Sequence, residues 1–384
     1  MSLSRASRGG FADWWWTVDR LAVLAIVSLF GIGLMLAFAA SPAASAGPLT
    51  AGNFNYAAKQ IAFAAVAVLV MCAASSLTPV QVRRAALVIF LVSLIACIAV
   101  LVVGTETLGA RRWLDLRWIT LQPSEFLKPS FAVLVAAILA EREPLPVPKP
   151  GLTLVLLVPA LAVLLLEPDV GQSFLLVALW GALLFFAGMS LKWIWAIGGG
   201  SAGLGMAAYF LFPHVHHRVE QFLHPDQKGY QTGTSLKAFS HGGLFGVGPG
   251  AGTVKYHLPD VHSDFIFAVA GEEFGLLLCA VIVLLFCFLA VRLLLRSAAS
   301  REPFTQLAGA GLAMVVALQA FINMGVAISL LPAKGMTLPF ISYGGSSLFA
   351  VALTMGFALA LIRQRPKLAV RDDEPLIPFL GGRP

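Results

Sequence analysis

Long runs of apolar residues recur along the whole chain, and they constrain its fold more than any other feature. Stretches such as Leu21–Ala40, Ala57–Ser75 and Ala85–Gly104 approach the ~20 apolar residues that a helix needs to cross a bilayer. Only 12% of the 384 residues are charged, whereas a soluble domain carries about 25%. The sequence therefore predicts an all-α polytopic membrane protein.

Ten such stretches predict ten transmembrane helices in one domain over residues 21–363, flanked by tails over residues 1–20 and 364–384. The helices are expected to begin near Leu21, Ala57, Ala85, Leu127, Leu152, Val170, Trp193, Asp264, Phe304 and Ser346. If both tails are placed inside, the inner segments hold most of the 26 Lys and Arg residues. This asymmetry predicts cytoplasmic N- and C-termini.

The first apolar stretch has some marks of a signal peptide, because arginines precede it and Ala44-Ser45-Ala46 follows it. A signal core has only ~7–15 apolar residues, which is shorter than this stretch. We therefore expect a retained first helix.

Two outer segments are long enough to carry function. One covers Thr105–Phe126. The other covers about 213–263, between the seventh and eighth helices, and contains all seven histidines of the chain. His214-Val-His-His could hold a metal, but no closed ligand set is visible, which favours interfacial histidines without a ligand role.

Several other functions are disfavoured. The glycine-rich stretch 242–252 has no preceding strand and no Gly-Lys-Ser/Thr, which argues against nucleotide binding. The net charge of +7 is explained by basic inner loops beside anionic lipid, and no basic stripe with aromatics suggests nucleic-acid binding. The four cysteines lie in apolar runs, as buried hydrophobic residues do, so a disulfide framework is not expected.

Six acidic residues lie in or beside the apolar runs, where a charge is costly and usually faces a polar cavity or a partner. They are Glu125, Glu167, Asp169, Asp264, Glu272 and Glu273. Each is a functional candidate, and the alternative for each is a structural ion pair. We interpret Glu272 and Glu273 as structural or cavity-lining.

Asp264 differs from the others in position, because it lies where the large outer segment enters a helix. The interface can hydrate its carboxylate while the helix holds it in place, which suits a general base acting on a hydroxyl. A plain N-cap is the alternative, since Asp caps helices well.

The first outer segment supplies cations. Pro123 is typical of a helix start, and Glu125 and Lys128 are three residues apart, so they can pair on one helix face. Arg111, Arg112 or Lys128 could bind a phosphate, for which arginine offers a planar pair of donors. The alternative is an ordinary capped helix end.

Separated segments resemble the SEDS family of bacterial cell-wall glycosyltransferases, whose name stands for shape, elongation, division and sporulation. The similar segments are Arg112-Trp113, Gln122–Lys128, Glu167–Gly171, His262–Phe267, Gly271–Gly275 and Leu331–Ser347. Lys334-Gly-Met-Thr and Gly271 are more similar to the division branch than to the elongation branch. The chain departs from the family pattern at His241, Asp260, Ser263 and Glu167, where a small residue, Glu, Thr and Gln are usual.

The resemblance implies polymerisation of lipid II into glycan strands during cell division, at the outer face of the bacterial inner membrane. The essential aspartate of the family falls on Asp264. The resemblance also implies undecaprenyl-pyrophosphate-linked glycan as substrate. A class B penicillin-binding transpeptidase and other division proteins of the membrane are the implied partners.

We expect an inverting transfer in which Asp264 removes the proton of the attacking hydroxyl. The pyrophosphate leaving group then needs charge neutralisation, for which Arg111, Arg112, Lys128 and Lys237 are candidates, with a role for Mg²⁺ or Mn²⁺ left open. A lipid II flippase and a non-catalytic division scaffold are the alternatives.

Overall fold

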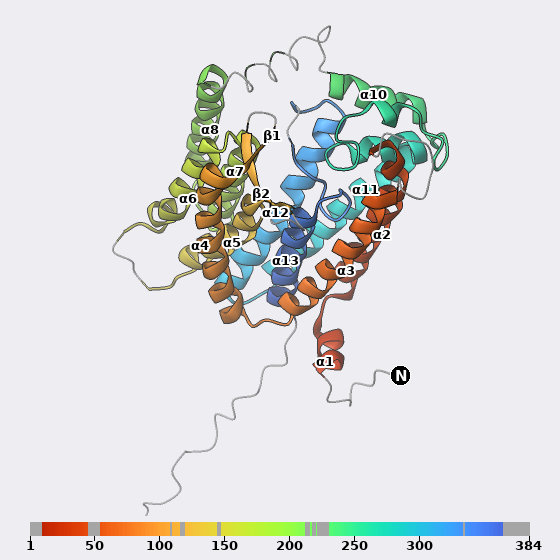
Figure 1. Cartoon of the computed structure of the whole chain (residues 1–384). Helices are drawn as coiled ribbons and strands as arrows, with labels where there is room; N and C mark the ends of the chain where they lie inside the picture. The colour runs from red at the N-terminus through yellow and green to blue at the C-terminus, as the bar shows by residue number, and fades with distance from the viewer. Residues whose placement is uncertain are drawn as a thin grey trace, which may run out of the picture.

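Ten helices match the ten predicted spans, and they form one bundle (Figure 1). The structure is a computed structural model that describes residues 10–44, 54–107, 110–115, 120–143, 147–211, 216, 220, 230–332 and 335–363. The ten helices are α2 (Arg20–Ala44), α3 (Asn55–Ser75), α4 (Pro79–Val103), α5 (Pro123–Leu139), α6 (Lys149–Leu166), α7 (Val170–Phe186), α8 (Leu191–Leu211), α11 (Ile266–Ala298), α12 (Pro303–Ala327) and α13 (Gly345–Ile362). The predicted all-helical polytopic architecture is therefore confirmed, although within the described residues only seven of these helices are both long and apolar enough to cross a membrane by themselves.

Local sequence explains several helix ends. The Thr78 hydroxyl and the Gln81 side chain cap the start of α4 reciprocally, and Pro79 occupies its first turn. Pro123 begins α5, as its position in the sequence predicted. Between α6 and α7 the Asp169 carboxylate accepts a hydrogen bond from the Gln172 N–H at 3.2 Å, so a capped helix start follows the break directly.

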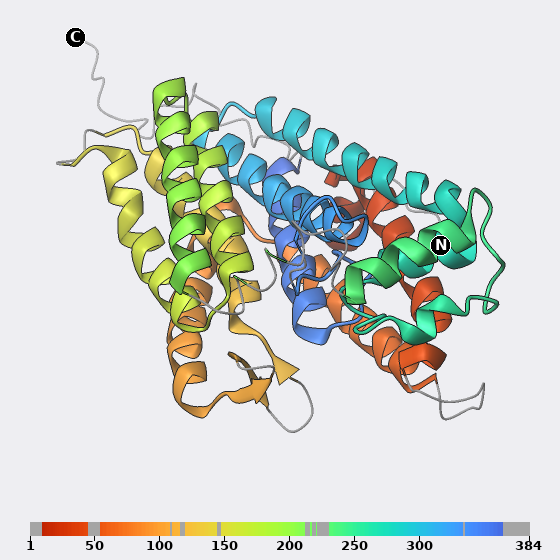
Figure 2. The ribbon, with the colours of Figure 1, turned by 90° about the horizontal axis from the view of Figure 1, so that it is seen from above.

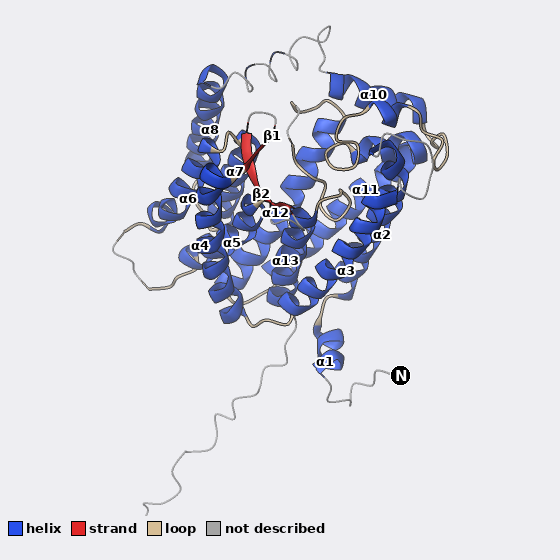
Figure 3. Cartoon of the chain, viewed as in Figure 1, coloured by secondary structure: helices blue, strands red, loops and turns tan. Residues whose placement is uncertain are grey.

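The core lies around α5, α12 and α13, which are buried along most of their lengths. Figure 3 shows α13 between α5 and α3, and α4 and α6 lie toward the outside of the bundle. Many Leu and Val side chains of α4 are exposed, among them Val102 at 76%. Exposed apolar residues in a multi-pass protein form the surface that faces lipid, so α4 belongs to that surface.

An ion-pair cluster lies next to the short helix α1 (Gly10–Thr17), at the end of the bundle that we call inner after the sequence prediction, and the opposite end is called outer. Asp19 accepts hydrogen bonds from Arg292 at 2.9 Å and from Arg296 at 2.7 Å. Burial alone raises the pKa of the Asp19 carboxyl, but the hydrogen bonds and charges of the two arginines outweigh it and leave this pKa below its usual value. Nearby, Arg363 donates to the Thr17 hydroxyl at 2.5 Å. The residue that follows α13 thus contacts the end of α1, so the first and last described helices meet here.

The outer segments contain structure that the sequence did not predict. Residues 105–121 include a three-stranded antiparallel sheet in the order β1 (Thr105–Thr107), β2 (Ala110–Asp115) and β3 (Thr120–Leu121). The second segment includes α10 (Tyr230–Gly242) and the 3₁₀ helix η3 (Val254–His257). Interpreting both as loops was incomplete, because elements this short leave little periodicity to detect.

Helix α11 is broken near its outer end. Gly275 has a φ of 76°, a left-handed conformation that favours glycine. A Cβ at this position would also collide with the backbone of the turn that follows α10. The break therefore lets another segment pack directly against the α11 backbone.

Candidate active site

Asp264 lies half-buried in the turn that leads into α11 at the outer end of the bundle. Its N–H donates to the carbonyl of Asp260 at 3.1 Å, and its carbonyl accepts from the Asn323 side chain at 2.9 Å. The same Asn323 amide donates to the carbonyl of Met336 at 2.6 Å. Gly335 is also close, because a Cβ there would lie 3.4 Å from Oδ2 of Asp264. Asn323 thus holds together the turn that carries Asp264 and the start of the segment 335–344.

The structure places Asp264 one residue before the N-cap position of α11. The residue at that position is Phe265, whose side chain makes no capping hydrogen bond. A capping Asp would accept from the second or third N–H of the helix. A catalytic or a capping role for the Asp264 carboxylate therefore stays a prediction.

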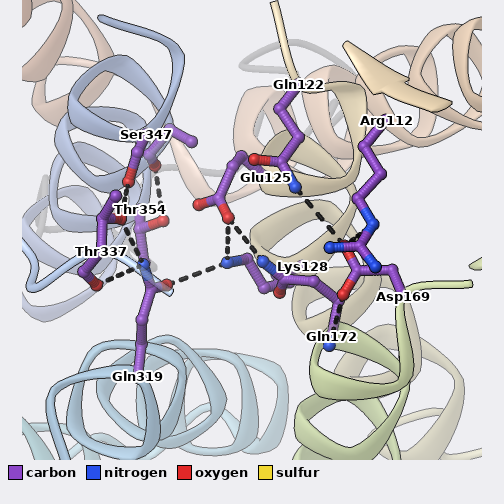
Figure 4. A network of polar contacts seen from close by, with 11 residues as sticks. Arg112, Gln122, Glu125, Lys128, Asp169, Gln172, Gln319, Thr337, Ser347 and Thr354 are labelled. Carbon is purple, nitrogen blue, oxygen red and sulfur yellow. Dashed lines mark hydrogen bonds and ion pairs between the residues drawn. The ribbon is translucent and has the colours of Figure 1, made fainter. Parts of the chain in front are cut away.

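A buried polar network lies next to this site (Figure 4). The Lys128 ammonium donates to Glu125 and to Gln319, each at 2.9 Å, so the predicted pairing of Glu125 and Lys128 is present. Gln172 donates to the same Glu125 oxygen at 2.7 Å. On the other side, the Gln319 amide donates to the carbonyl of Thr337 at 3.2 Å. The network therefore runs from α7 through α5 and α12 into the segment 335–344.

One face of α12 joins this network to Asp264. Gln319 and Asn323 are four residues apart, which places both on the same helix face with a rise of ~6 Å between them. Gln319 binds Lys128, and Asn323 binds the backbone of Asp264. A single rigid helix thereby fixes the spacing between a buried cation and the candidate base.

Arg112 lies on β2 and points into the bundle, with its side chain 21% exposed. Its guanidinium donates to the carbonyls of Glu167 at 3.3 Å and Pro168 at 2.5 Å, and lies 3.9 Å from the Asp169 carboxylate (Figure 4). Gln122 also contacts Asp169, at 3.5 Å. These contacts hold the break between α6 and α7 in place, a role that the sequence did not predict for Arg112.

Glu167 is buried, and it lies beside the Cys97 thiol in addition to Asp169 and Arg112. The two acids of the break, Glu167 and Asp169, therefore differ in their hydrogen-bond partners. The Asp169 carboxylate accepts two hydrogen bonds, from Gln122 and Gln172, whereas Glu167 binds Arg112 through its backbone carbonyl.

The other two candidate cations are exposed at the outer end. Arg111 precedes Arg112 on β2 and so projects from the opposite face of the strand, donating to the carbonyl of Leu101 at 3.4 Å. Lys237 is exposed on α10. Figure 1 shows β2 and α10 on opposite sides of the outer surface. The structure therefore brings Arg112 and Lys128 into the bundle and leaves Arg111 and Lys237 at its surface.

Glu272 and Glu273 organise the outer segment instead of joining the Asp264 site. The fully buried Glu272 carboxylate accepts from the N–H groups of Val254 at 2.7 Å and Lys255 at 2.9 Å, at the start of η3. It also pairs with His241 at 3.0 Å. Glu273 forms a buried ion pair with Lys255, whose ammonium also donates to the carbonyl of Ala39 in α2 at 2.8 Å.

No three His, Cys, Asp or Glu side chains within the described residues are arranged to hold a metal. His214 and His217 of the candidate metal motif lie outside the described residues. His216, which is described, stacks on Tyr209 with 4.5 Å between ring centroids. We therefore derive no catalytic step through a metal ion.

Reasoning from sequence missed the neutral members of the site. Gln172, Gln319 and Asn323 are buried amides that bind its charged residues and backbone. A buried amide is costly unless it is hydrogen-bonded, and each of the three lies inside an apolar run of the sequence. A polar amide inside an apolar run therefore could have marked these three residues as site candidates, as a carboxylate in such a run marked the acids.

Comparison with known proteins gives a consistent result. A family model described as cell cycle protein, covering FtsW, RodA and SpoVE, matches residues 20–367. A probable peptidoglycan glycosyltransferase FtsW of Caulobacter vibrioides is 44% identical over 368 residues, covering 95% of this chain and 94% of that protein. A protein with the same description from Alkalilimnicola ehrlichii is 36% identical, and the similarity covers 98% of this chain and 96% of that protein.

Two solved structures are similar along most of the chain. One belongs to a peptidoglycan synthase complex that coordinates polymerization and crosslinking, with a TM-score of 0.76, 26% identity and coverage of 91% of this chain and 98% of the other. The other is the rod shape determining protein RodA of Thermus thermophilus, with a TM-score of 0.67, 24% identity and coverage of 92% of this chain and 99% of RodA. At this identity the similarity supports the fold alone.

Proposed function

Because the chain belongs to the FtsW, RodA and SpoVE family of cell cycle proteins, we propose that it polymerises lipid II with Asp264 as general base. The chain is a multi-pass membrane protein with the activity of a peptidoglycan glycosyltransferase. Lipid II is the substrate class that fits a glycosyl transfer carried out within a bilayer. The observation that carries the catalytic proposal is the α12 face that binds both Lys128 and the backbone of Asp264.

The proposed reaction is an inverting transfer. The 4-hydroxyl of one lipid-linked disaccharide attacks C1 of the sugar at the end of the growing strand. The Asp264 carboxylate accepts the hydroxyl proton, the C1–oxygen bond to pyrophosphate breaks, and undecaprenyl pyrophosphate leaves with the electron pair. Pyrophosphate is already a good leaving group, so one base and nearby cations suffice, in contrast to the carboxyl pair of a glycosidase.

The four candidate cations divide into two kinds. Arg111 and Lys237 are exposed at the outer surface, where a pyrophosphate headgroup arrives. Lys128 and Arg112 are engaged by protein groups, and two of the three ammonium donors of Lys128 are used by Glu125 and Gln319. We assign the first contact with pyrophosphate to Arg111 and Lys237, and to Lys128 and Arg112 the positioning of the site.

Replacing Arg112 by alanine should therefore lower stability more than it lowers the turnover of folded protein. The variant loses the contacts with the carbonyls of Glu167 and Pro168 and the charge beside Asp169, a loss of about 1.5–3 kcal/mol. Arg111→Ala is the matched control and should lose turnover at low lipid II with little change in melting temperature. Thermal melting and strand synthesis measured on both variants test the assignment, and an inversion of the two phenotypes would overturn it.

The cellular setting follows from the same proposal. Both termini lie in the cytoplasm and the Asp264 end faces the outside of the inner membrane, in agreement with the distribution of Lys and Arg. The site of action is the division site, and a class B penicillin-binding transpeptidase is the partner. The similar chain from a complex that coordinates polymerization and crosslinking supports such a partner.

Purified protein in vesicles that contain lipid II tests the function directly. The glycan product and the translocated headgroups are both counted, so a polymerase and a flippase are distinguished in one sample. We expect strands without net translocation. A flippase would use Glu167, Asp169, Glu272 and Glu273 as a polar path, but the carboxylates of Asp169, Glu272 and Glu273 already bind protein groups, which leaves Glu167 alone. Translocation without polymer would contradict the proposed function.

A further inference from the structure

The turn that follows α10, residues 243–248, exposes two adjacent large apolar side chains. Leu244 is 54% exposed and Phe245 is 74% exposed, and no residue of the turn is charged. We propose that this turn is a membrane anchor whose Leu244 and Phe245 insert into the outer leaflet of the bilayer. The proposal does not depend on the catalytic role of Asp264.

The turn is fixed to α11 by backbone hydrogen bonds at the helix break. The N–H groups of Leu276 and Leu277 donate to the carbonyls of Gly243 at 3.0 Å and Leu244 at 3.3 Å. In the other direction, the N–H groups of residues 247 and 248 donate to the carbonyls of residues 272 and 273, each at 3.0 Å. The break at Gly275 frees these groups, so the turn is seated as rigidly as a paired strand.

Glycines make this seating possible. A Cβ on Gly246 would collide with the carbonyl of Glu273, and Gly246 has a φ of 82°. Gly242 similarly approaches the carbonyl of Gly271 too closely for a side chain. The glycine-rich sequence therefore serves close packing against α11, and it presents the Leu-Phe pair outward.

The depth of the turn follows from the length of α11. Arg292, near the inner end of this helix, binds Asp19 at the inner end of the bundle. A helix rises ~1.5 Å per residue, so Gly275 lies about 25 Å from Arg292 along the axis. The hydrocarbon layer is ~30 Å thick. Residues 244 and 245 are held beside the break, so they lie close to the outer boundary of the hydrocarbon layer.

The surroundings identify the occupant as lipid. Leu276 and Leu277, which bind the turn, are each 49% exposed on the outward face of α11, so the apolar pair continues a surface that already faces lipid. Figure 2 shows the segment after α10 at the edge of the bundle, beyond α11. An apolar pair of this kind at a membrane boundary inserts into the headgroup and acyl region, as interfacial anchors do.

Photo-crosslinking tests the proposal on the full-length protein. Phe245 is replaced by p-benzoylphenylalanine, and the protein is reconstituted in vesicles of phosphatidylethanolamine and phosphatidylglycerol, irradiated and weighed by intact mass spectrometry. We expect a one-phospholipid adduct in a yield comparable to that of the same probe at Leu277, and several-fold above that at Glu143, an exposed inner-loop residue. Phe245 is exposed, so the probe should not disturb folding.

Two outcomes would overturn the anchor. Residue 245 would face water if its lipid adduct were no more abundant than the adduct at 143, and it would face a protein if it linked mainly to a second copy of the chain. A pair of glycine variants tests the seating in the same assay with the probe at 245. Gly246→Ala should lower the lipid adduct several-fold. Gly243 also has a left-handed backbone, with a φ of 55°, but a Cβ there meets nothing within 4 Å, so Gly243→Ala should lower the adduct less.

Discussion

Asp264→Asn is expected to lower strand synthesis by ~10²–10⁴-fold, the usual contribution of a general base, while the protein folds and inserts normally. Asparagine keeps the shape of the side chain but cannot accept the hydroxyl proton. The hydrogen bonds with Asp260 and Asn323 use the backbone of Asp264, so the change leaves them unaffected. Purified protein, lipid II and an assay that separates glycan strands by length give the measurement, and near-normal polymer would remove Asp264 from the mechanism.

Asp260→Asn is the matched control for this experiment. Asp260 lies on the same turn, is exposed, and has a φ of 49°, which asparagine tolerates well. Its contacts with Asp264 and Phe265 are made by its backbone carbonyl, which the substitution retains. Asp260→Asn should therefore keep both melting temperature and activity. Equal losses in the two variants would mean that the negative charge of the outer turn matters and that a base at residue 264 does not.

The membrane-spanning helices and the position of Asp264 just before one of them were predictable from the sequence. Apolar runs specify spanning helices directly, because a backbone in lipid must satisfy its own hydrogen bonds. The acid at the start of the eighth span was visible as a charge in a costly position. The environment of Asp264 could not be predicted, because Asn323, which binds its carbonyl, and Met336, which Asn323 also binds, come from segments far along the chain.

Contacts that cross between helices were the part that the sequence did not predict. Arg112 belongs to a short strand, and its partners are the carbonyls of residues 167 and 168. In the sequence nothing distinguishes Lys255 from the other lysines of the outer segments, whereas in the structure it binds Glu273 and the carbonyl of Ala39. Spacing along one helix reveals neighbours such as Glu125 and Lys128, whereas pairs between helices depend on how the helices pack.

Removing one member of the buried pair of Lys255 and Glu273 should destabilise the outer segment strongly. Both side chains are almost completely inaccessible, and the Lys255 ammonium binds α2 through the carbonyl of Ala39. Lys255→Met leaves the Glu273 carboxylate buried with only the N–H of Gly250 as a described partner. Removing one member of a buried pair costs about 3–5 kcal/mol, so the melting temperature should fall and protease should cut the segment 243–257 faster.

A double variant separates the pair from a general loss of packing. Lys255→Met combined with Glu273→Gln removes both charges, so it should recover much of the loss, because no uncompensated charge stays buried. Lys237→Met, an exposed lysine on α10, is the control and should change stability by less than about 0.5 kcal/mol. A double variant no better than Lys255→Met would show that Lys255 acts through its contact with Ala39. The pair would then not be what holds the outer segment on α11.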